Sequence, residues 1–521
     1  MTARTLARAG LTVTAAFLLS RVLGWVRLVV IADLFGAGAE LDAYFAAFRI
    51  PDLIYQLVAA GALSSALIPV LSGLLHRDEV DRAWRVVSSV VNLMLLGLAV
   101  FSVAMAVGAP VIVPAITPGF DRPTSDLTVH LTRIMLLSPV LLALGSVASS
   151  VLNTQGRFAA AAAAPLLYNA AIIVAALLLK PILGIDSLAV GVVLGSLLHL
   201  CVQLPQLRGR FRYERAVDLS DAAARQALLL MGPRAIGLGA SQITFIVNTT
   251  LASTLGVGSI VAYNVAFTII QIPIGIIGMP LGVVLLPSMS QAVAAGAMRE
   301  FGALVIQSLR LLLYVMIFLT AVAMVLRRQV VALLFGYGSF DARALDLTSD
   351  TLLFFLAGMA GHSMIVVLAR AFYSGQDTRT PVIAAIISVL VNVAVSLLSV
   401  GILGLSGLAL GIAVGAWVEA SFLAVLLWQR SPAARLGSLV RPSLMFAAGA
   451  FLAAVAAFGV VRLTDPLIGL DPGKLGLFLQ VVVATGAASV VYVAYSRLLH
   501  IPELGQAVSL MRSAFHRPSG S

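Results

Sequence analysis

The residues best suited to bind a ligand are charged side chains inside two long apolar segments near the N-terminus. Arg21 and Arg27 lie near the middle of the first segment, Arg49 lies in the second, and Asp42 stands at the mouth of the second. An arginine at the centre of a bilayer costs about 2.5–3.5 kcal/mol on insertion scales, so such residues mark function unless they reach the interface. Guanidinium groups bind phosphate through paired hydrogen bonds. The arginines therefore predict a site for an anionic, phosphate-bearing ligand.

The spacing of these charges leaves structural explanations open. On one helix Arg21 and Arg27 are about 9 Å apart along the axis and about 120° apart around it, so both could border a wide water-filled cavity but not one narrow stripe. Arg49 and Asp52, at i and i+3, can form an ion pair, which explains them as well as a ligand does. Asp42 could simply cap its own span.

Motifs for catalysis and metal binding are missing from the sequence. The six histidines are scattered, the single cysteine is Cys201, and no Walker A motif, nucleophile elbow or HExxH motif occurs. We therefore expect no enzyme activity, no catalytic residues, no metal and no cofactor. The predicted spans hold almost no carboxylates after Asp52, so a proton relay along carboxylates has little support.

The elements that must hold these charges follow from the composition. Of 521 residues, 60% are hydrophobic and 11% charged, against about 25% charged in soluble domains, which excludes most soluble folds. The apolar runs are long and continuous, whereas the strands of a membrane barrel alternate apolar and polar residues. About 20 apolar residues cross the hydrocarbon core as a helix. The sequence therefore predicts an all-α polytopic membrane protein with about 14 transmembrane helices.

Fourteen candidate spans lie between polar breaks. They cover 9–34, 41–74, 86–110, 128–153, 159–179, 186–205, 226–254, 260–290, 302–326, 346–373, 380–400, 405–429, 442–463 and 475–499. The second and eighth are long and contain prolines, which predicts kinks or broken helices there. The first lacks an Ala-x-Ala cleavage pattern and continues beyond Arg27, so we expect a retained helix rather than a signal peptide.

Membrane topology accounts for most of the net charge of +11. With the N-terminus inside, nineteen of the 33 basic residues fall in cytoplasmic segments, seven in the opposite segments and seven within spans. This bias predicts that both termini are cytoplasmic. It also removes the need for a nucleic-acid partner, and we expect none.

An internal repeat relates the two halves of the chain. Three motifs return at nearly the same offset: Ala43–Phe48 as Ala262–Phe267 at 219 residues, Ile68–Ser72 as Leu286–Ser290 at 218, and 152–155 as 373–376 at 221. Six spans separate the copies, an even number, so both copies insert with the same orientation around an axis along the membrane normal. In transporters such repeats form two lobes around a central cavity.

The repeat predicts the following organisation. An N-terminal six-helix lobe covers 1–207, a cytoplasmic linker with a short helix 208–225, a C-terminal six-helix lobe 226–430, a terminal helix pair 438–500 and a cytoplasmic tail 501–521. The first two spans of the second copy hold only Arg234, so the N-terminal lobe is the more basic one.

One set of motifs is typical of a known family. It begins with Ser20-Arg21-Val22-Leu23-Gly24-Trp25-Val26-Arg27, continues with Leu34–Gly38 and Asp42–Tyr44, and extends more weakly to Ala60–Ser64, 152–158, 230–233 and 285–290. The pattern resembles the MurJ (MviN) lipid II flippases of the multidrug/oligosaccharidyl-lipid/polysaccharide exporter superfamily. The resemblance implies two six-helix lobes, a cationic central cavity, and a groove for the polyprenyl tail in spans 13 and 14.

The resemblance also assigns residues to the substrate site. The basic cavity residues of the family fall on Arg21 and Arg27, its acidic residue falls on Asp42, and Arg49 stands where a basic residue is usual.

Three positions depart from the pattern of the family. Leu28 replaces a common acidic residue, and Tyr55 and Thr268 replace arginines. We hypothesise that Arg234, one helix away from Thr268, supplies a replacement charge.

The function that the resemblance implies is transport of a lipid-linked precursor. The chain would move undecaprenyl-diphosphate-linked peptidoglycan precursor, lipid II, across the bacterial cytoplasmic (inner) membrane by alternating access. Expected partners are this polyprenyl-diphosphate-linked precursor and membrane lipid, with cell-wall synthesis proteins as further candidates. The alternatives are a flippase for another polyprenyl-linked glycan, a drug/cation antiporter, and a scaffold that binds the precursor without translocating it. An antiporter would need acidic cavity residues, which this sequence largely lacks.

Overall fold

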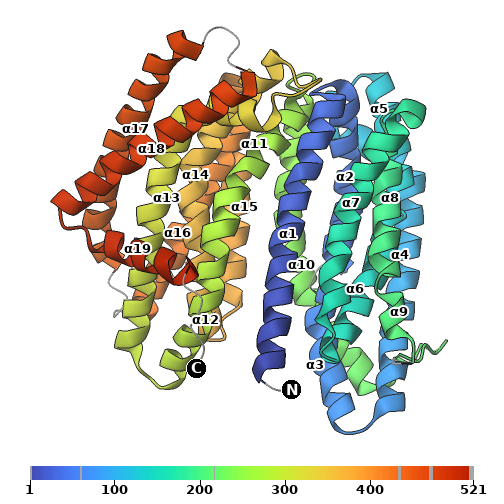
Figure 1. Ribbon diagram of the computed structural model, residues 1–521. Helices are drawn as coiled ribbons and strands as arrows, with labels where there is room; N and C mark the ends of the chain where they lie inside the picture. The colour runs from blue at the N-terminus through green and yellow to red at the C-terminus, as the bar shows by residue number, and fades with distance from the viewer. Residues whose placement is uncertain are drawn as a thin grey trace. The chain divides into compact units, whose positions relative to one another are not determined.

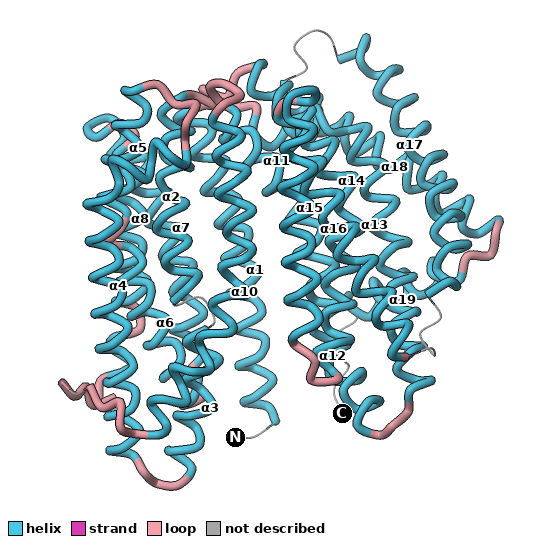
Figure 2. Tube along the Cα trace, turned by 180° about the vertical axis from the view of Figure 1, so that it is seen from behind, coloured by secondary structure: helices cyan, strands magenta, loops and turns pink. Residues whose placement is uncertain are grey.

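The computed structural model describes residues 3–58, 62–209, 211–215, 217–431, 436–468 and 473–515. Throughout these ranges the chain forms helices joined by short turns, and no strand occurs in them (Figure 1 and Figure 2). In lipid, a helix satisfies every backbone hydrogen bond within its own segment, which is why continuous apolar runs adopt this form. The predicted all-α polytopic fold class is confirmed.

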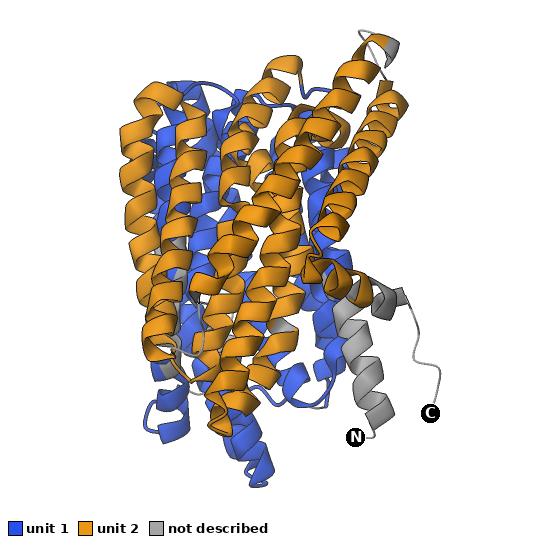
Figure 3. Cartoon of the chain, turned by 90° about the vertical axis from the view of Figure 1, so that its left-hand side faces the viewer, with its two compact units in different colours: residues 1–261, 338–340 blue, residues 262–337, 341–521 orange. Residues whose placement is uncertain are grey.

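The chain divides into two compact units, shown in Figure 3. The first contains Met1–Val261 and Gly338–Phe340, and the second contains Ala262–Tyr337 and Asp341–Ser521. The helices of the first unit are α1 (Ala3–Phe35), α2 (Ala39–Val58), α3 (Ala62–His76), α4 (Val80–Ile116), α5 (Arg122–Met135), α6 (Ser138–Thr154), α7 (Phe158–Leu183), α8 (Asp186–Cys201), α9 (Leu204–Leu207) and α10 (Ala222–Ser253).

The second unit starts within helix α11. Its elements are α11 (Ser259–Pro273), the π-helical turn η1 (Ile274–Gly278), α12 (Met279–Ala294), α13 (Met298–Phe335), α14 (Ala342–Ser374), α15 (Arg379–Leu403), α16 (Leu405–Arg430), the 3-10 turn η2 (Leu436–Leu439), α17 (Val440–Ile468), α18 (Gly473–Leu498) and α19 (Pro502–Phe515). The division of the repeat into lobes at 1–207 and 226–430 remains a prediction.

Each predicted span falls on a helix or on consecutive helices. Eleven helical segments within the described ranges are long and apolar enough to cross a membrane, so the count of fourteen is not confirmed. In the eighth span, where we expected a kink or a break, the chain stays helical from Ser259 to Ala294, but the π-helical turn η1 follows Pro273 directly and lies between α11 and α12. A single π turn of this kind locally interrupts the regular hydrogen bonds of a helix.

The outer surfaces of these helices carry large apolar side chains. Ile182 on α7 is 79% exposed, Val111 on α4 76%, and Ile402 on α15 85%. Such exposure would cost free energy in water, whereas lipid tails solvate these side chains. The exposed apolar surface is therefore the one expected of helices that face lipid.

Local structure extends the repeat beyond the motifs found in the sequence. Gly184 and Gly404, 220 positions apart, both have φ of 55° and ψ within one degree of −131°. Asp121 and Asp341, also 220 positions apart, each cap the start of a helix by accepting a backbone N–H three residues on. These matches show that the turns, and not only the spans, recur in the second copy.

Helix α10 packs within the first unit, where it contacts α2, α3 and α4. The core beside it contains Ile54 from α2, Leu67 and Leu71 from α3, and Trp84 and Val87 from α4. This packing places one face of α10 along α2, which carries two of the predicted site residues.

The second unit is held together by aromatic and polar contacts around α13. Tyr314 on α13 stacks on Tyr492 of α18 with ring centres 4.9 Å apart, and its hydroxyl lies 2.9 Å from Ser496 Oγ. One turn earlier, Arg310 forms an ion pair with the buried carboxylate of Glu503 on α19. These contacts fix α18 and α19 to α13.

Candidate functional site

Arg49 points from α2 toward α10. Its Nε donates a hydrogen bond to Thr249 Oγ1 at 3.0 Å, and its guanidinium carbon lies 5.2 Å from the centre of the Phe245 ring. Thr249 and Phe245 lie one turn apart on α10, so they share a face. The hydrogen bond and the cation–π contact together hold the charge of Arg49 between the two helices.

Asp52, one turn after Arg49, contacts the same face of α10. Its Oδ2 accepts a hydrogen bond from Gln242 Nε2 at 3.3 Å, and Gln242 is 7% exposed. Arg49, Asp52, Gln242 and Thr249 therefore form a line of polar side chains between α2 and α10, which we call the polar seam. Polar groups in such a place can bind phosphate or hydroxyl groups of a ligand.

Tyr55 lies on the next turn of α2 and contacts α6. Its hydroxyl is 3.4 Å from Ser146 Oγ, and either oxygen can be the donor. Tyr55, which stands where the family pattern has an arginine, is thus a neutral side chain, and its contact is the neutral hydroxyl of Ser146.

Arg27 is half-buried and contacts a different helix. Its guanidinium carbon lies 6.0 Å from the centre of the Tyr168 ring on α7, the helix against which α1 packs. Arg21, nearly two turns earlier, is exposed. The structure thus places Arg27 beside α7 and Arg49 beside α10.

Asp42 is buried, with 2% exposure, and caps a helix other than its own. Its Oδ2 accepts from the backbone N of Gly258 at 2.6 Å and its Oδ1 from the backbone N of Val261 at 2.8 Å. These N–H groups belong to the start of α11, where helices have no backbone acceptors for them and where negative charge is favoured. Both carboxylate oxygens are therefore used in capping the first turn of α11.

The predicted role of Arg234 lies outside the described residues. The backbone at this position belongs to α10, but the side chains from 230 to 238 are not described. Thr268, whose missing charge Arg234 was expected to replace, donates its hydroxyl to the backbone oxygen of Asn264 at 2.8 Å.

The linker positions the start of α10. Asp221 accepts the backbone N–H of Ala223 at 2.8 Å and receives two hydrogen bonds from Arg82 of α4, at 2.7 and 3.2 Å. The hydrogen bond from Arg82 is the main reason why the pKa of Asp221 lies below its usual value. Ser88 and Ser89 of α4 accept the backbone N–H groups of residues 214 and 218 at 3.0 Å each. The linker is thus fastened to α4 along several residues.

Comparison with known proteins identifies the family. The family model described as "Lipid II flippase MurJ" matches residues 31–469. The chain belongs to the MurJ family of lipid II flippases. It is 34% identical over 426 residues to "Lipid II flippase MurJ" of Burkholderia cenocepacia, covering 80% of this chain and 82% of the relative. It is 29% identical over 494 residues to "Probable lipid II flippase MurJ" of Rhizobium tropici, covering 91% and 92%.

Solved structures confirm the fold of the family. The chain matches "Lipid II flippase MurJ, inward closed conformation" with a TM-score of 0.78 at 23% identity, over 94% of this chain and 98% of that one. An inward-facing multidrug resistance MATE transporter matches with a TM-score of 0.65 at 17% identity, over 80% and 95%. As a MurJ family member, the chain is a multi-pass membrane transport protein and not an enzyme. Within the described residues, no group of three His, Cys, Asp or Glu side chains could hold a metal ion.

In this MurJ family member, sequence reasoning missed the contribution of α10 to the polar seam. Gln242, Phe245 and Thr249 are spaced at i, i+3 and i+7, which places them on one face of a helix. That periodicity was a usable signal, because two of the three are polar in an apolar span. The capping of α11 by Asp42 had no such signal, since the donors are backbone N–H groups.

Proposed function

We propose that this chain moves undecaprenyl-diphosphate-linked peptidoglycan precursor, lipid II, from the cytoplasmic to the outer leaflet by alternating access. The observation that carries the proposal is the match of the MurJ family model over residues 31–469, with relatives of the same name covered over most of their length. Transport without ATP hydrolysis agrees with the missing Walker A motif.

We assign the diphosphate to Arg21, Arg27 and Arg49. Arginine binds phosphate oxygens in pairs, and Arg27 and Arg49 are positive charges within the predicted membrane spans, where charge is costly unless it serves a function. Arg234 stays a candidate for the same role.

We assign Asp42 a positioning role within this site. A carboxylate would repel a diphosphate, and both of its oxygens already accept backbone N–H groups of α11. Its negative charge near α11 therefore supports the arrangement of the helices rather than contact with the anionic part of the substrate.

The remaining parts of the proposal concern the surroundings of the protein. Both termini face the cytoplasm, supported by the excess of basic residues on that side. The helix pair at 438–500 contacts the polyprenyl tail, supported by exposed apolar side chains on α17 and α18 such as Phe451 at 67% and Phe478 at 50%. Proteins of cell-wall synthesis are candidate partners.

A second candidate, a flippase for another polyprenyl-linked glycan, is favoured by one observation. Tyr55 and Thr268 stand where the family pattern has arginines, and both are neutral. Fewer positive charges at these places would weaken contacts to a diphosphate while keeping hydroxyl groups for a sugar.

The test is rescue of a bacterium depleted of its own lipid II flippase. We expect the wild-type chain to rescue growth and Arg21→Ala with Arg27→Ala to fail, whereas Arg379→Ala, at the exposed first residue of α15, should rescue fully. Growth with both arginines neutralised would overturn the proposed mechanism. Transport of lipid II and of other polyprenyl-linked glycans by the purified chain in vesicles separates the two candidates, and binding without transport would favour the scaffold.

A further inference from the structure

Tyr168 on α7 contacts Arg27 of α1 and packs closely on α8. The centre of its ring lies 6.0 Å from the guanidinium carbon of Arg27. On α8, a Cβ atom at Gly195 would lie 2.7 Å from the backbone O of Tyr168 and 3.1 Å from its ring carbon Cδ2. Only glycine allows so close an approach without a shift of the backbone. This packing fixes where the ring of Tyr168 lies.

The hydroxyl of Tyr168 has charged and polar neighbours from a third helix, α2. It interacts electrostatically with Arg27 and with Asp52 and Tyr55 of α2. Tyr168 and Asp52 are half-buried, and the Tyr168 hydroxyl forms no hydrogen bond with the residues that the structure describes. We call Arg27, Asp52, Tyr55 and Tyr168 the tyrosine cluster. All four belong to the first compact unit.

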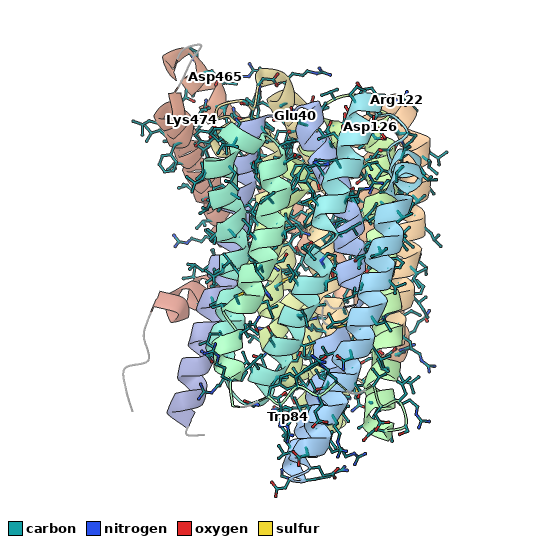
Figure 4. The ribbon with its side chains drawn as sticks, turned by 90° about the vertical axis from the view of Figure 1, so that its right-hand side faces the viewer. Glu40, Trp84, Arg122, Asp126, Asp465 and Lys474 are labelled. Atoms are coloured by element: carbon teal, nitrogen blue, oxygen red, sulfur yellow. The ribbon has the colours of Figure 1, made fainter. Side chains whose placement is uncertain are left out.

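The helices place Tyr168 and Asp52 at the same depth. A short turn joins the end of α1 to the start of α2, and Lys180 of α7 donates to the backbone at that end of α1. Tyr168 is 12 residues before Lys180 and Asp52 is 12 residues after Glu40, so each lies about 18 Å from this end along its helix. Figure 4 shows Glu40 at one end of the first unit and Trp84 at the other. The tyrosine cluster therefore lies well inside the bundle of helices.

The chemistry of the tyrosine cluster suits a sugar better than a second phosphate. Each of the two phenol hydroxyls can donate and accept a hydrogen bond, as the hydroxyls of a sugar do. The Asp52 carboxylate can accept a hydrogen bond from a sugar hydroxyl, whereas it would repel phosphate oxygens. Arg27 supplies positive charge for a phosphate next to that sugar. A polar group without a partner in apolar surroundings costs free energy, which a bound hydroxyl group recovers.

The tyrosine cluster occurs in one copy of the repeat. At the offsets of the repeat, 219 positions for α2 and 220 for α7, Tyr55 corresponds to Ile274 and Tyr168 to Ser388. The second copy thus has no phenol at either position. Side chains that only served the shared fold would be expected in both copies, so this difference favours a role in ligand binding.

We propose that Asp52, Tyr55 and Tyr168 bind the sugar next to the diphosphate of the lipid-linked precursor, and that Tyr168 is a further specificity-determining residue. This inference rests on the proposed function, because it takes the substrate to be a polyprenyl-diphosphate-linked glycan and Arg27 to bind its diphosphate. Through its ring, Tyr168 also contacts that arginine. The same residue therefore sets the position of the sugar relative to the phosphate.

The test compares two ligands of the detergent-purified chain, lipid II and undecaprenyl diphosphate, which lacks the sugar. We expect Tyr55→Phe with Tyr168→Phe to weaken the binding of lipid II roughly ten-fold, because two neutral hydrogen bonds are lost while both rings stay. The binding of undecaprenyl diphosphate should stay unchanged. Tyr373→Phe, at an exposed tyrosine near the end of α14, is the matched control and should bind both ligands as the wild type does.

Binding needs no transport, so the outcomes separate this inference from the proposed function. Equal losses for both ligands, or no loss for either at unchanged thermal stability, would overturn the assignment of the sugar. If the double variant does not accumulate, Asp52→Asn should weaken the binding of lipid II alone, and any other result with that variant would overturn the assignment. A selective loss in a chain that moves neither ligand across vesicles would support the tyrosine cluster and contradict the proposed function.

Discussion

Asp42 accepts a hydrogen bond from the residue that occupies its own position in the second copy of the repeat. The two residues are 219 positions apart, and Asp42 Oδ1 lies 2.8 Å from the backbone N of Val261. The first copy thus carries a carboxylate where the second carries an apolar side chain. One copy therefore supplies the acceptor and the other the donor of a hydrogen bond between equivalent positions of the repeat.

Removing this carboxylate should loosen the start of α11. We expect Asp42→Ala to lose about 1 kcal/mol or more of stability, the usual cost of a lost helix cap, because two backbone N–H groups lose their acceptor. Thermal unfolding of the detergent-purified protein measures it. Asp126→Ala, at an exposed position of α5, is the control and should unfold as the wild type does. A variant of Asp42 as stable as this control would show that the cap contributes nothing.

The features that could be predicted from the sequence are those that depend on neighbouring residues or on similar residues at a fixed offset. A span needs about 20 consecutive apolar residues, so the runs around Val111 and Ile402 were sufficient to place helices. The repeat was visible because similar residues return at one offset. The turn containing Gly119 and its counterpart at Ser339 went unnoticed, because only two adjacent residues are identical between them, Phe120-Asp121 and Phe340-Asp341, and so short a match is weak evidence by itself.

The contacts of the site could not be predicted, because they depend on how helices pack. Asp52 at i+3 offered a local ion-pair partner for Arg49, but both side chains also have partners on α10 about 190 to 200 residues away. Asp42 is likewise far in sequence from the start of α11 that it caps. Its donors could not be recognised by residue type, because every residue except proline has a backbone N–H. Residue type alone named the charged positions as candidates, and their role in binding stays a prediction, whereas their contact partners required the fold.

The linker should resist proteolysis as long as it stays fastened to α4. The side chain of Arg82 is 40% exposed, so solvent screens its ion pair with Asp221 and the pair is weak by itself. We expect Arg82→Ala to increase tryptic cleavage within the linker only about two-fold, because Ser88 and Ser89 still hold it. Ser88→Ala with Ser89→Ala should add to this effect. Arg85→Ala, an exposed neighbour on α4, should cleave like the wild type, and a large increase in this control would mean that any loss of charge loosens the linker.

The stability of the folded protein should depend on pH through the carboxylate of Asp377, which lies in the turn between α14 and α15. Burial would raise its pKa, but hydrogen bonds from Thr380 and Arg430 outweigh burial and lower the pKa to about 2. A lowered pKa in the folded state means that the carboxylate stabilises the fold above its ordinary pKa of 3.8 and loses this effect as the pH falls toward 2. Asp377→Asn should therefore unfold at a lower temperature than the wild type at pH 7, with the gap shrinking between pH 4 and about pH 2. A gap that stays constant over this range would rule out the titration of Asp377 as its cause.

The polar seam should contribute to transport through the orientation of Arg49. Thr249→Val keeps the shape of the side chain but removes the acceptor for Arg49 Nε, and hydrogen bonds to charged groups contribute about 1.5–3 kcal/mol. If that orientation is needed when the diphosphate binds, lipid II transport in vesicles should fall roughly ten-fold in Thr249→Val, and further in Arg49→Ala. Combining the two substitutions should cost no more than Arg49→Ala alone, because both remove the same interaction. Thr250→Val is the matched control, since that hydroxyl donates only to the backbone O of Ile246 on its own helix. Additive losses in the double variant would show that Thr249 acts on transport independently of Arg49.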